Sequence, residues 1–378
     1  MNPNWPSWLP LREDLSELSP YGAPQIEVPV RLNTNENPYN LSDDLQRALL
    51  DEISRSLKVL NRYPDRDSIA LREALANSIN VSHGTDVDPA SIWAANGSNE
   101  IIQTILLAFE GGALGFEPSY SMHPLISKVV GKNWFSIPRD KNFEIGDPQI
   151  EKAIDATESK IIFITTPNNP TGTSTSLELI SKVATATASR QGLVVVDEAY
   201  GEFSKNPSAI TLIKRHPNVL VSKTMSKAFA FAGARLGYLV ADPKVIEALQ
   251  LVRLPYHLSA LTQAAALAAI SKQNSLRKDV ERLREAREEV AKEINSMGLK
   301  SYPSEANFLL FSGFIDSSAM LWEELLNRGV LVRDVGIAGH LRVTIGTRAE
   351  NRAFLDALRE ITESRGVKRQ DNNPEVRG

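Results

Sequence analysis

Residues 222–238 read Ser-Lys-Thr-Met-Ser-Lys-Ala-Phe-Ala-Phe-Ala-Gly-Ala-Arg-Leu-Gly-Tyr, and this segment is the most informative part of the chain. The amine of Lys227 can condense with an aldehyde, and the hydroxyls of Thr224 and Ser226 can hydrogen-bond a phosphate. The forked guanidinium of Arg235 can hold the same phosphate. Pyridoxal phosphate is a cofactor that carries both groups. The alternative is an exposed lysine ahead of a small-residue helix, and the rest of the chain decides between the two.

The composition bounds the size and class of the protein. A chain of 378 residues exceeds what one hydrophobic core supports, so a large and a smaller domain are expected. The net charge of −4 comes from mixed charges without long single-sign runs, which argues against nucleic-acid binding. The chain has no cysteine and its five histidines lack paired ligand spacing, so we expect no metal site. Without a secretory signal or a bilayer-length apolar run, we expect a cytoplasmic protein with no membrane contact.

Short β-rich runs alternate with longer helical patterns in the middle of the chain. The runs cover residues 91–95, 160–165, 192–196, 218–222 and 236–240. This alternation predicts an α/β fold in which a mostly parallel sheet lies between helices. Such sheets bind ligands beyond the carboxyl ends of their strands. The polar residues that follow each run are therefore candidates for a functional site.

The pattern changes near residue 276, where a long charged amphipathic helix begins and extends through residue 297, and shorter strands and helices follow. We expect an N-terminal segment (1–45) associated with the small domain and a large cofactor-binding domain (46–270). A small C-terminal α+β domain (271–365) and a flexible tail (366–378) complete the chain.

Two of the polar segments suit a phosphate and a ring oxygen. In Asn-Gly-Ser-Asn-Glu (96–100), a glycine turn leads into a helix whose first amides can bind phosphate, although a plain capped helix is the alternative. In Thr-Thr-Pro-Asn-Asn-Pro (165–170), prolines flank asparagines that can hydrogen-bond a fixed ring oxygen. The alternative is that these residues simply form a tight turn, since proline and asparagine both favour turns.

Asp197 ends a run of valines, where a carboxylate needs a cationic partner. A protonated pyridine nitrogen is such a partner, and Tyr200 could reach the ring's phenolate oxygen. An ion pair with an arginine or a magnesium ligand are the alternatives, but no GxxxxGK[ST] phosphate loop supports the latter. Tyr120 is a candidate to stack on the ring, or simply packs in the core.

Taken together, these motifs resemble fold type I pyridoxal-phosphate enzymes and, among them, the histidinol-phosphate aminotransferase family. The resemblance extends from about residue 21 to residue 352. The segments that carry it, besides the lysine segment, are residues 32–38 (Leu-Asn-Thr-Asn-Glu-Asn-Pro), 62–64, 96–100, 117–124, 166–172, 196–200, 254–257 and 341–342.

The resemblance implies a seven-stranded, mostly parallel sheet in the large domain, and a homodimer with a composite active site. Lys227 would bond covalently to the cofactor, Asp197 would face the ring nitrogen, Asn169 and Tyr200 would face the ring oxygen, and Tyr120 would stack on the ring. The phosphate contacts that it implies are the amides of Ser98 and Asn99, the hydroxyls of Thr224 and Ser226, Arg235, and Tyr63 of the other subunit.

The resemblance also implies the substrates. Glutamate would donate its amino group and leave as 2-oxoglutarate, and imidazole-acetol phosphate would accept the group to give histidinol phosphate. Arg342 would hold the carboxylate of glutamate. The residues expected around the phosphate and the imidazole are Tyr21, Asn99, His123, Tyr256, Arg333 and Arg342.

Three other functions stay open at this point. An aromatic amino-acid aminotransferase differs by small pocket changes, because a phenyl ring can take an imidazole's place. A decarboxylating relative that acts on phosphothreonine is the second. A catalytically silent regulatory protein that keeps the cofactor is the third, and the retained lysine, aspartate and arginine argue against it.

Overall fold

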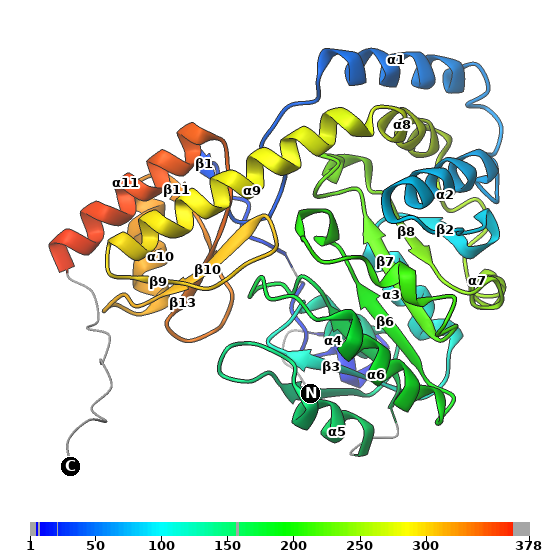
Figure 1. Cartoon of the computed structure of the whole chain (residues 1–378), viewed down its shortest axis with the longest axis horizontal. Coiled ribbons are helices and arrows are strands. Elements are labelled where there is room, and N and C mark those ends of the chain that lie inside the picture. The colour runs from blue at the N-terminus through cyan, green and yellow to red at the C-terminus, as the bar shows by residue number, and fades with distance from the viewer. Residues whose placement is uncertain (1–4, 7, 21, 156–158, 366–378) are drawn as a thin grey trace.

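Two β-sheets organise the chain into two lobes (Figure 1). The computed structural model describes residues 5–6, 8–20, 22–155 and 159–365. The larger sheet has seven strands in the order β2-β8-β7-β6-β5-β3-β4. Their bounds are β2 Ile92–Ala95, β3 Gly112–Glu117, β4 Trp134–Pro138, β5 Ser159–Thr165, β6 Leu193–Asp197, β7 Val219–Thr224 and β8 Gly237–Val240.

The central strands of this sheet are parallel, and β8 runs against them. Alternate residues of each strand enter different cores: Val194 and Val196 face one hydrophobic cluster and Val195 faces another. Helices α2, α6 and α8 pack in the first cluster, and α3, α4 and α7 in the second. The helices of this lobe are α1 Asp43–Leu57, α2 Ile69–His83, α3 Ser98–Ala108, α4 Met122–Val129, α5 Asp147–Asp155, α6 Leu177–Ala188, α7 Pro243–Gln250 and α8 Ala260–Ser271.

Short 3-10 helices shape several connections in the chain. They are η1 Glu13–Leu15, η2 Pro89–Ser91, η3 Gly201–Phe203, η4 Ala209–Leu212 and η5 Ala232–Ala234. Of these, η3 directly follows the turn at the end of β6.

The smaller lobe is built on an antiparallel sheet in the order β12-β13-β10-β9. Its core is a separate cluster that includes Phe308, Phe311 and Phe354. Helix α9, Gln273–Ser296, joins the lobes: Leu276 near its start packs in the large lobe, and Ile294 near its end packs in the small one (Figure 1). The other elements are β9 Lys300–Ser301, β10 Phe308–Ser312, α10 Ser318–Asn327, β12 Arg333–Asp334, β13 His340–Thr344 and α11 Arg348–Arg365.

The N-terminal part of the chain returns to the small lobe. Strand β1, Val30–Arg31, pairs in parallel with β11, Val330–Leu331. The residues just after β1 are thereby carried to the junction between the lobes. Helix α1 follows, and the Ser42 side chain caps it by accepting a hydrogen bond from the Leu45 amide.

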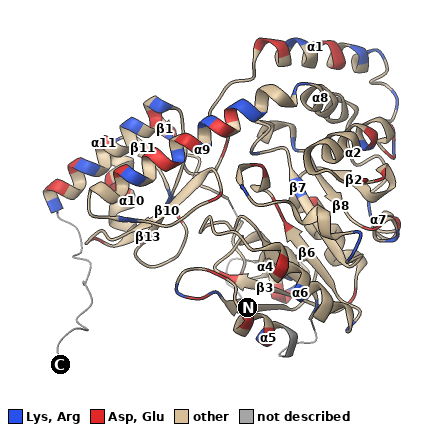
Figure 2. Ribbon diagram, viewed as in Figure 1, with Lys and Arg blue, Asp and Glu red and all other residues tan. Residues whose placement is uncertain are grey.

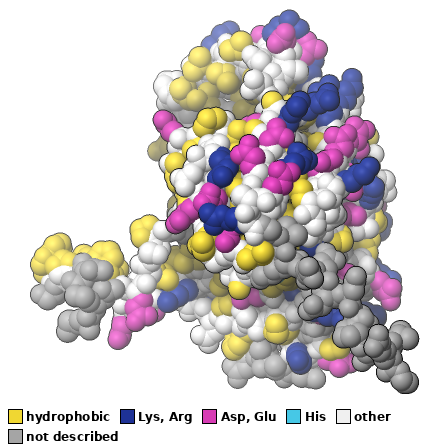
Figure 3. Space-filling model, turned by 90° about the vertical axis from the view of Figure 1, so that its left-hand side faces the viewer, with side chains coloured by type: hydrophobic (Ala, Val, Ile, Leu, Met, Phe, Trp, Pro, Cys, Tyr) yellow, Lys and Arg dark blue, Asp and Glu magenta, His cyan; other side chains and the backbone are white. Residues whose placement is uncertain are grey.

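Charged residues gather on the helices and are sparse on the strands of the large sheet (Figure 2). On the face shown in Figure 3, acidic and basic side chains are interspersed. Within the described ranges, no helix is long and apolar enough to span a membrane.

The predicted α/β class and the mostly parallel seven-stranded sheet are confirmed. All five predicted runs form strands, but β3 and β4 were not anticipated. The antiparallel direction of β8 was not anticipated either. The boundaries at residues 45, 270 and 365 stay a prediction.

Candidate active site

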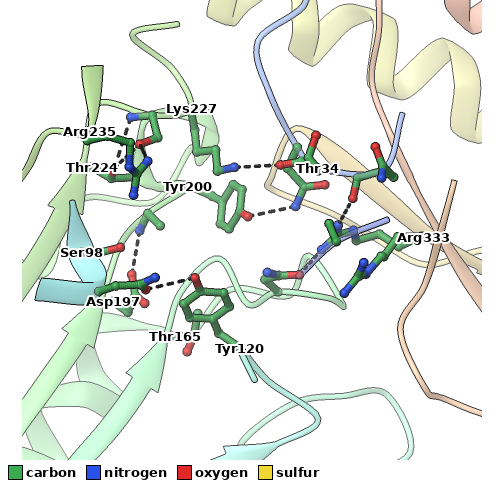
Figure 4. A pocket seen from close by; sticks show the side chains of 18 residues that line it. Thr34, Ser98, Tyr120, Thr165, Asp197, Tyr200, Thr224, Lys227, Arg235 and Arg333 are labelled. Carbon is green, nitrogen blue, oxygen red and sulfur yellow. Dashed lines mark hydrogen bonds between the residues drawn. The ribbon is translucent and has the colours of Figure 1, made fainter. Parts of the chain in front are cut away.

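A pocket of about 210 Å³ lies where the carboxyl ends of β5, β6 and β7 meet the small lobe (Figure 4). Thr165 and Asp197 are register partners at the ends of adjacent strands, so the parallel sheet itself brings their segments together. The residues that line the pocket are Ala23, Asn33, Thr34, Asn35, Ser98, Asn99, Tyr120, Thr165, Asn169, Asp197, Ala199, Tyr200, Thr224, Ser226, Lys227, Arg235, Arg333 and Arg342.

Lys227 is half-buried, and its Nζ donates a hydrogen bond to the Thr34 carbonyl at 2.9 Å (Figure 4). Burial, together with the nearby Arg342 and Arg235, lowers the pKa of this amine to about 8, while Glu36 opposes them. With that pKa about a tenth of the amine is neutral at pH 7, against about 0.03% for an ordinary lysine. Lys227 is thus suited to attack an aldehyde.

An anion-binding cup lies beside this lysine. Helix α3 begins after Gly97 without a side-chain cap, so its first amides have no partner within the helix, and Ser98 and Asn99 at this end line the pocket. Thr224 Oγ1 donates to Ser226 Oγ at 3.0 Å, and Arg235 Nη1 lies 3.4 Å from the same Ser226 oxygen. A Cβ at Gly97 would lie 2.9 Å from Arg235 Nη2, so the glycine lets the guanidinium approach the helix end.

Asp197 lies at the floor of the pocket and is only 1% exposed. Its Oδ1 accepts a hydrogen bond from the Ala199 amide at 3.1 Å. Its Oδ2 lies 3.1 Å from His123 Nε2. Both carboxylate oxygens are therefore fixed, and the group is oriented for a cationic ligand atom above it.

Polar groups from both lobes surround the space between Lys227 and Asp197. The Tyr200 hydroxyl accepts from Asn35 Nδ2 at 2.9 Å, and the Tyr120 hydroxyl donates to Asn99 Oδ1 at 3.1 Å. Asn169 Oδ1 accepts from Arg342 Nη1. Every predicted cofactor residue except Tyr63 thus lies at one pocket.

Two arginines make the small-lobe wall of the pocket positive. Arg333 on β12 and Arg342 on β13 are directly opposed register partners, and both line the pocket. Like charges on facing strand positions repel each other, so an anion between them is favourable. Arg342 also donates to the Asn33 carbonyl at 2.7 Å, whereas the Arg333 side chain makes no hydrogen bond or ion pair within the described part of the chain.

Three predicted residues, Tyr63, Tyr256 and His123, do not line this pocket, and Tyr21 falls outside the described residues. Tyr63 is 79% exposed and stacks on Tyr256 at a centroid distance of 4.5 Å, away from this chain's own pocket. His123, expected beside the substrate, is instead buried next to Asp197 and stacked on Phe163, because its ring lies on the core side of the carboxylate.

Sequence reasoning gave no role to Asn33, Thr34 and Asn35. Backbone carbonyls of the first two accept hydrogen bonds from Arg342 and Lys227, and the Asn35 side chain reaches Tyr200. The only indication of their involvement was that the asparagine-rich residues 32–38 are among the segments that carry the family resemblance, without a role for any of them. This run enters the site because β1 pairs with the small lobe.

The chain is similar to known proteins along nearly its whole length. Residues 27–358 match the family model for class I and II aminotransferases. Histidinol-phosphate aminotransferase from Corynebacterium efficiens is 52% identical over 358 residues, covering 94% of this chain and 95% of that protein. The chain belongs to the histidinol-phosphate aminotransferase family. The relative from Mycolicibacterium smegmatis, with the same name, is 50% identical and covers 93% of both chains.

Solved structures agree on the fold. Histidinol-phosphate aminotransferase from Sinorhizobium meliloti, in complex with pyridoxal 5′-phosphate, superposes with a TM-score of 0.80 over 94% of this chain at 23% identity. At that identity the likeness shows the fold alone. The prediction of a fold type I, pyridoxal-phosphate-dependent aminotransferase is confirmed.

The residues of this pocket fit pyridoxal phosphate. The uncapped start of α3, two hydroxyls and Arg235 form a donor set for its phosphate, and Lys227 has a lowered pKa for its aldehyde. Asp197 presents a buried carboxylate for its ring nitrogen. The described residues hold no group of three or more His, Asp or Glu side chains placed to bind a metal ion.

Proposed function

We propose that this aminotransferase moves an amino group from glutamate to imidazole-acetol phosphate, giving L-histidinol phosphate and 2-oxoglutarate, in histidine biosynthesis. The observation that carries the proposal is about 50% identity to histidinol-phosphate aminotransferases along nearly the whole chain. The facing pair Arg333 and Arg342 supports it, because both substrates of the cycle carry an anionic group. We also propose that the enzyme works in the cytoplasm and that its substrates are small molecules.

The cofactor, when bound, withdraws the electron pair that remains when the substrate loses its Cα proton. Asp197 keeps the ring nitrogen protonated by charge, and Asn169 and Tyr200 hydrogen-bond the ring oxygen. Tyr120 packs on the ring face. The cup formed by the amides of Ser98 and Asn99, with Thr224, Ser226 and Arg235, holds the phosphate and fixes the ring's position relative to Lys227.

Lys227 has two tasks in this proposal. It would hold the cofactor through its aldehyde. Its amine would also be the group that takes up the proton from the substrate's Cα and gives it back. A lowered pKa suits this work, because the group must be neutral when it accepts the proton.

Substrate choice rests on the arginine wall. Arg342 can hold the glutamate carboxylate with its forked guanidinium, and Arg333 with Arg342 can share the phosphate of histidinol phosphate. An aromatic amino acid also carries a carboxylate, so Arg342 alone would serve it. Arg333 is therefore the residue that separates the two functions.

We expect Arg333→Gln to lower kcat/KM for histidinol phosphate by about 10- to 100-fold, since it removes a charged hydrogen bond to phosphate. The value for phenylalanine should change by less than about threefold. Steady-state kinetics with 2-oxoglutarate as acceptor measure both, and Arg352→Gln, on an exposed arginine, is the matched control. A wild-type preference for phenylalanine would favour the aromatic aminotransferase instead.

We also propose a homodimer whose active sites take Tyr63 from the partner subunit. Exposed apolar side chains cluster on the segment that carries Tyr63 and on the neighbouring one that carries Tyr256, and Arg253 ties the two segments together through Asp67. The exposed members are Leu57, Val59, Leu60, Leu251 and Leu254. A surface of this kind favours contact with a second copy.

A mixed-dimer experiment tests the shared site. Tyr63→Ala and Lys227→Ala should each reduce activity as pure dimers. When the two are co-expressed, half of the dimers are mixed, and each mixed dimer has one intact site, so about a quarter of wild-type activity should return. Activity that stays at the level of the separate variants would show that Tyr63 does not act across the dimer.

A further inference from the structure

Asp197 ends β6, and the turn that follows it carries Tyr200 and continues into η3. Within it, the Phe203 amide donates to the Tyr200 carbonyl, and the Ser204 amide donates to the Gly201 carbonyl. A helix as short as η3 leaves its last carbonyls without partners inside the helix. The position of the two cofactor residues therefore depends on what binds the carbonyls that follow them.

Arg284 on α9 binds these carbonyls. Its Nε donates to the Phe203 carbonyl at 2.9 Å, and its Nη2 donates to the Glu202 and Ser204 carbonyls at 3.0 and 2.6 Å. Its Nη1 is held by Glu281 at 2.6 Å. One guanidinium on the helix that joins the lobes thus satisfies three successive carbonyls beside the active site, a geometry that a lysine cannot reproduce.

Glu305 of the small lobe holds the same turn from another direction. Its carboxylate accepts hydrogen bonds from the Ser204 hydroxyl and, at 2.8 Å, from the Lys205 amide. The Glu305 amide in turn donates to the Gly172 carbonyl at 2.9 Å, close to the turn that carries Asn169. The small lobe therefore contacts two cofactor-binding turns of the large lobe.

The opposite side of the turn is fixed within the large lobe. Lys223 is only 3% exposed, and it pairs with Glu198 at 3.0 Å and Glu202 at 3.2 Å. These carboxylates raise the pKa of Lys223 above its ordinary value despite the opposing effect of burial. Because these ion pairs fix the start of the turn, the contacts from Arg284 and Glu305 set the position of η3 at its other end.

We infer that Arg284, assisted by Glu305, is a positioning residue that sets the alignment of Asp197 and Tyr200 through the carbonyls of residues 202–204 and couples it to the small lobe. The inference rests on the proposed roles of Asp197 and Tyr200. Neither Arg284 nor Glu305 lines the cofactor pocket, so each acts through the turn.

The test is a pH titration of the bound cofactor's absorbance, because the ring-nitrogen and ring-oxygen contacts set its midpoint. Arg284→Gln should shift that midpoint by about one unit and lower kcat by about 10- to 100-fold, as expected for a small misalignment. Arg284→Lys should fall in between. Lys278→Gln, an exposed position on the same helix, is the control and should match wild type.

Glu305→Gln gives an independent second arm. It weakens the hold on the same turn without touching α9, so the midpoint should move in the same direction by a smaller amount. If Arg284→Gln lowered only the melting temperature and left the midpoint and kcat at wild-type values, Arg284 would be structural and the inference overturned. If wild-type protein bound the cofactor but used another amino donor, only the proposed substrate would be wrong. The inference about Arg284 would still be testable, because the titration needs only bound cofactor.

Discussion

Replacing Lys227 with alanine should lower kcat by about 10⁴-fold or more, because one amine supplies both the covalent hold and the proton transfer. The phosphate cup and Asp197 stay in place, so the variant should still bind pyridoxal phosphate, though without a covalent bond. Single-turnover assays with histidinol phosphate measure the loss, and mass spectrometry after borohydride treatment reports the bond.

The matched control is Lys141→Ala, since Lys141 is exposed and lies outside the pocket. It should keep wild-type turnover and the covalent adduct. An alanine variant at position 227 that turned over at the wild-type rate would contradict the mechanism. Exogenous small amines should restore part of its activity, because they can carry the proton in place of the side chain.

Replacing Asp197 with asparagine should lower kcat by about 10²- to 10³-fold, the range typical of losing one electrostatic contact aimed at the reacting group. Asparagine has nearly the same shape and can still accept a hydrogen bond from the Ala199 amide, so folding should be preserved. The lost feature is the negative charge that keeps the ring nitrogen protonated. Kinetics, with circular dichroism as the check on folding, give the result.

Asp197→Glu separates charge from shape. It retains the carboxylate but displaces it, so its kcat should exceed that of the asparagine variant if charge dominates. Equal kcat values for wild type and Asp197→Asn would show that the ring nitrogen needs no anionic partner here. His123→Asn is a useful companion, because it removes the buried ring that lies beside Asp197 Oδ2 and stacks on Phe163.

The residues that meet at the pocket could largely be predicted because the parallel sheet places strand ends side by side. Asp197 and Thr224 end neighbouring strands, and the glycine turn at Gly97 precedes a helix start. Each of these positions follows a short apolar run that is easy to find in the sequence. Their roles toward the cofactor stay predictions.

The features that could not be predicted from the sequence depend on tertiary structure and not on local sequence patterns. β3 contains two glycines and β4 ends in Pro138 at the sheet edge, so neither has the β-branched composition of a typical strand. The direction of β8 depends on the connection before it. No local pattern shows that Asn35 will meet Tyr200 across 165 residues.

Contacts between distant parts of the chain also determine when the active site forms during folding. Arg342 and Asn33, 309 residues apart, must meet before the pocket has its complete wall, so long-range docking of the chain completes the site. The yellow colour of reconstituted protein can then report that the cofactor-binding residues have come together. Vitamin supply should in turn favour the finished state, since a ligand that binds only the native form draws the population toward it.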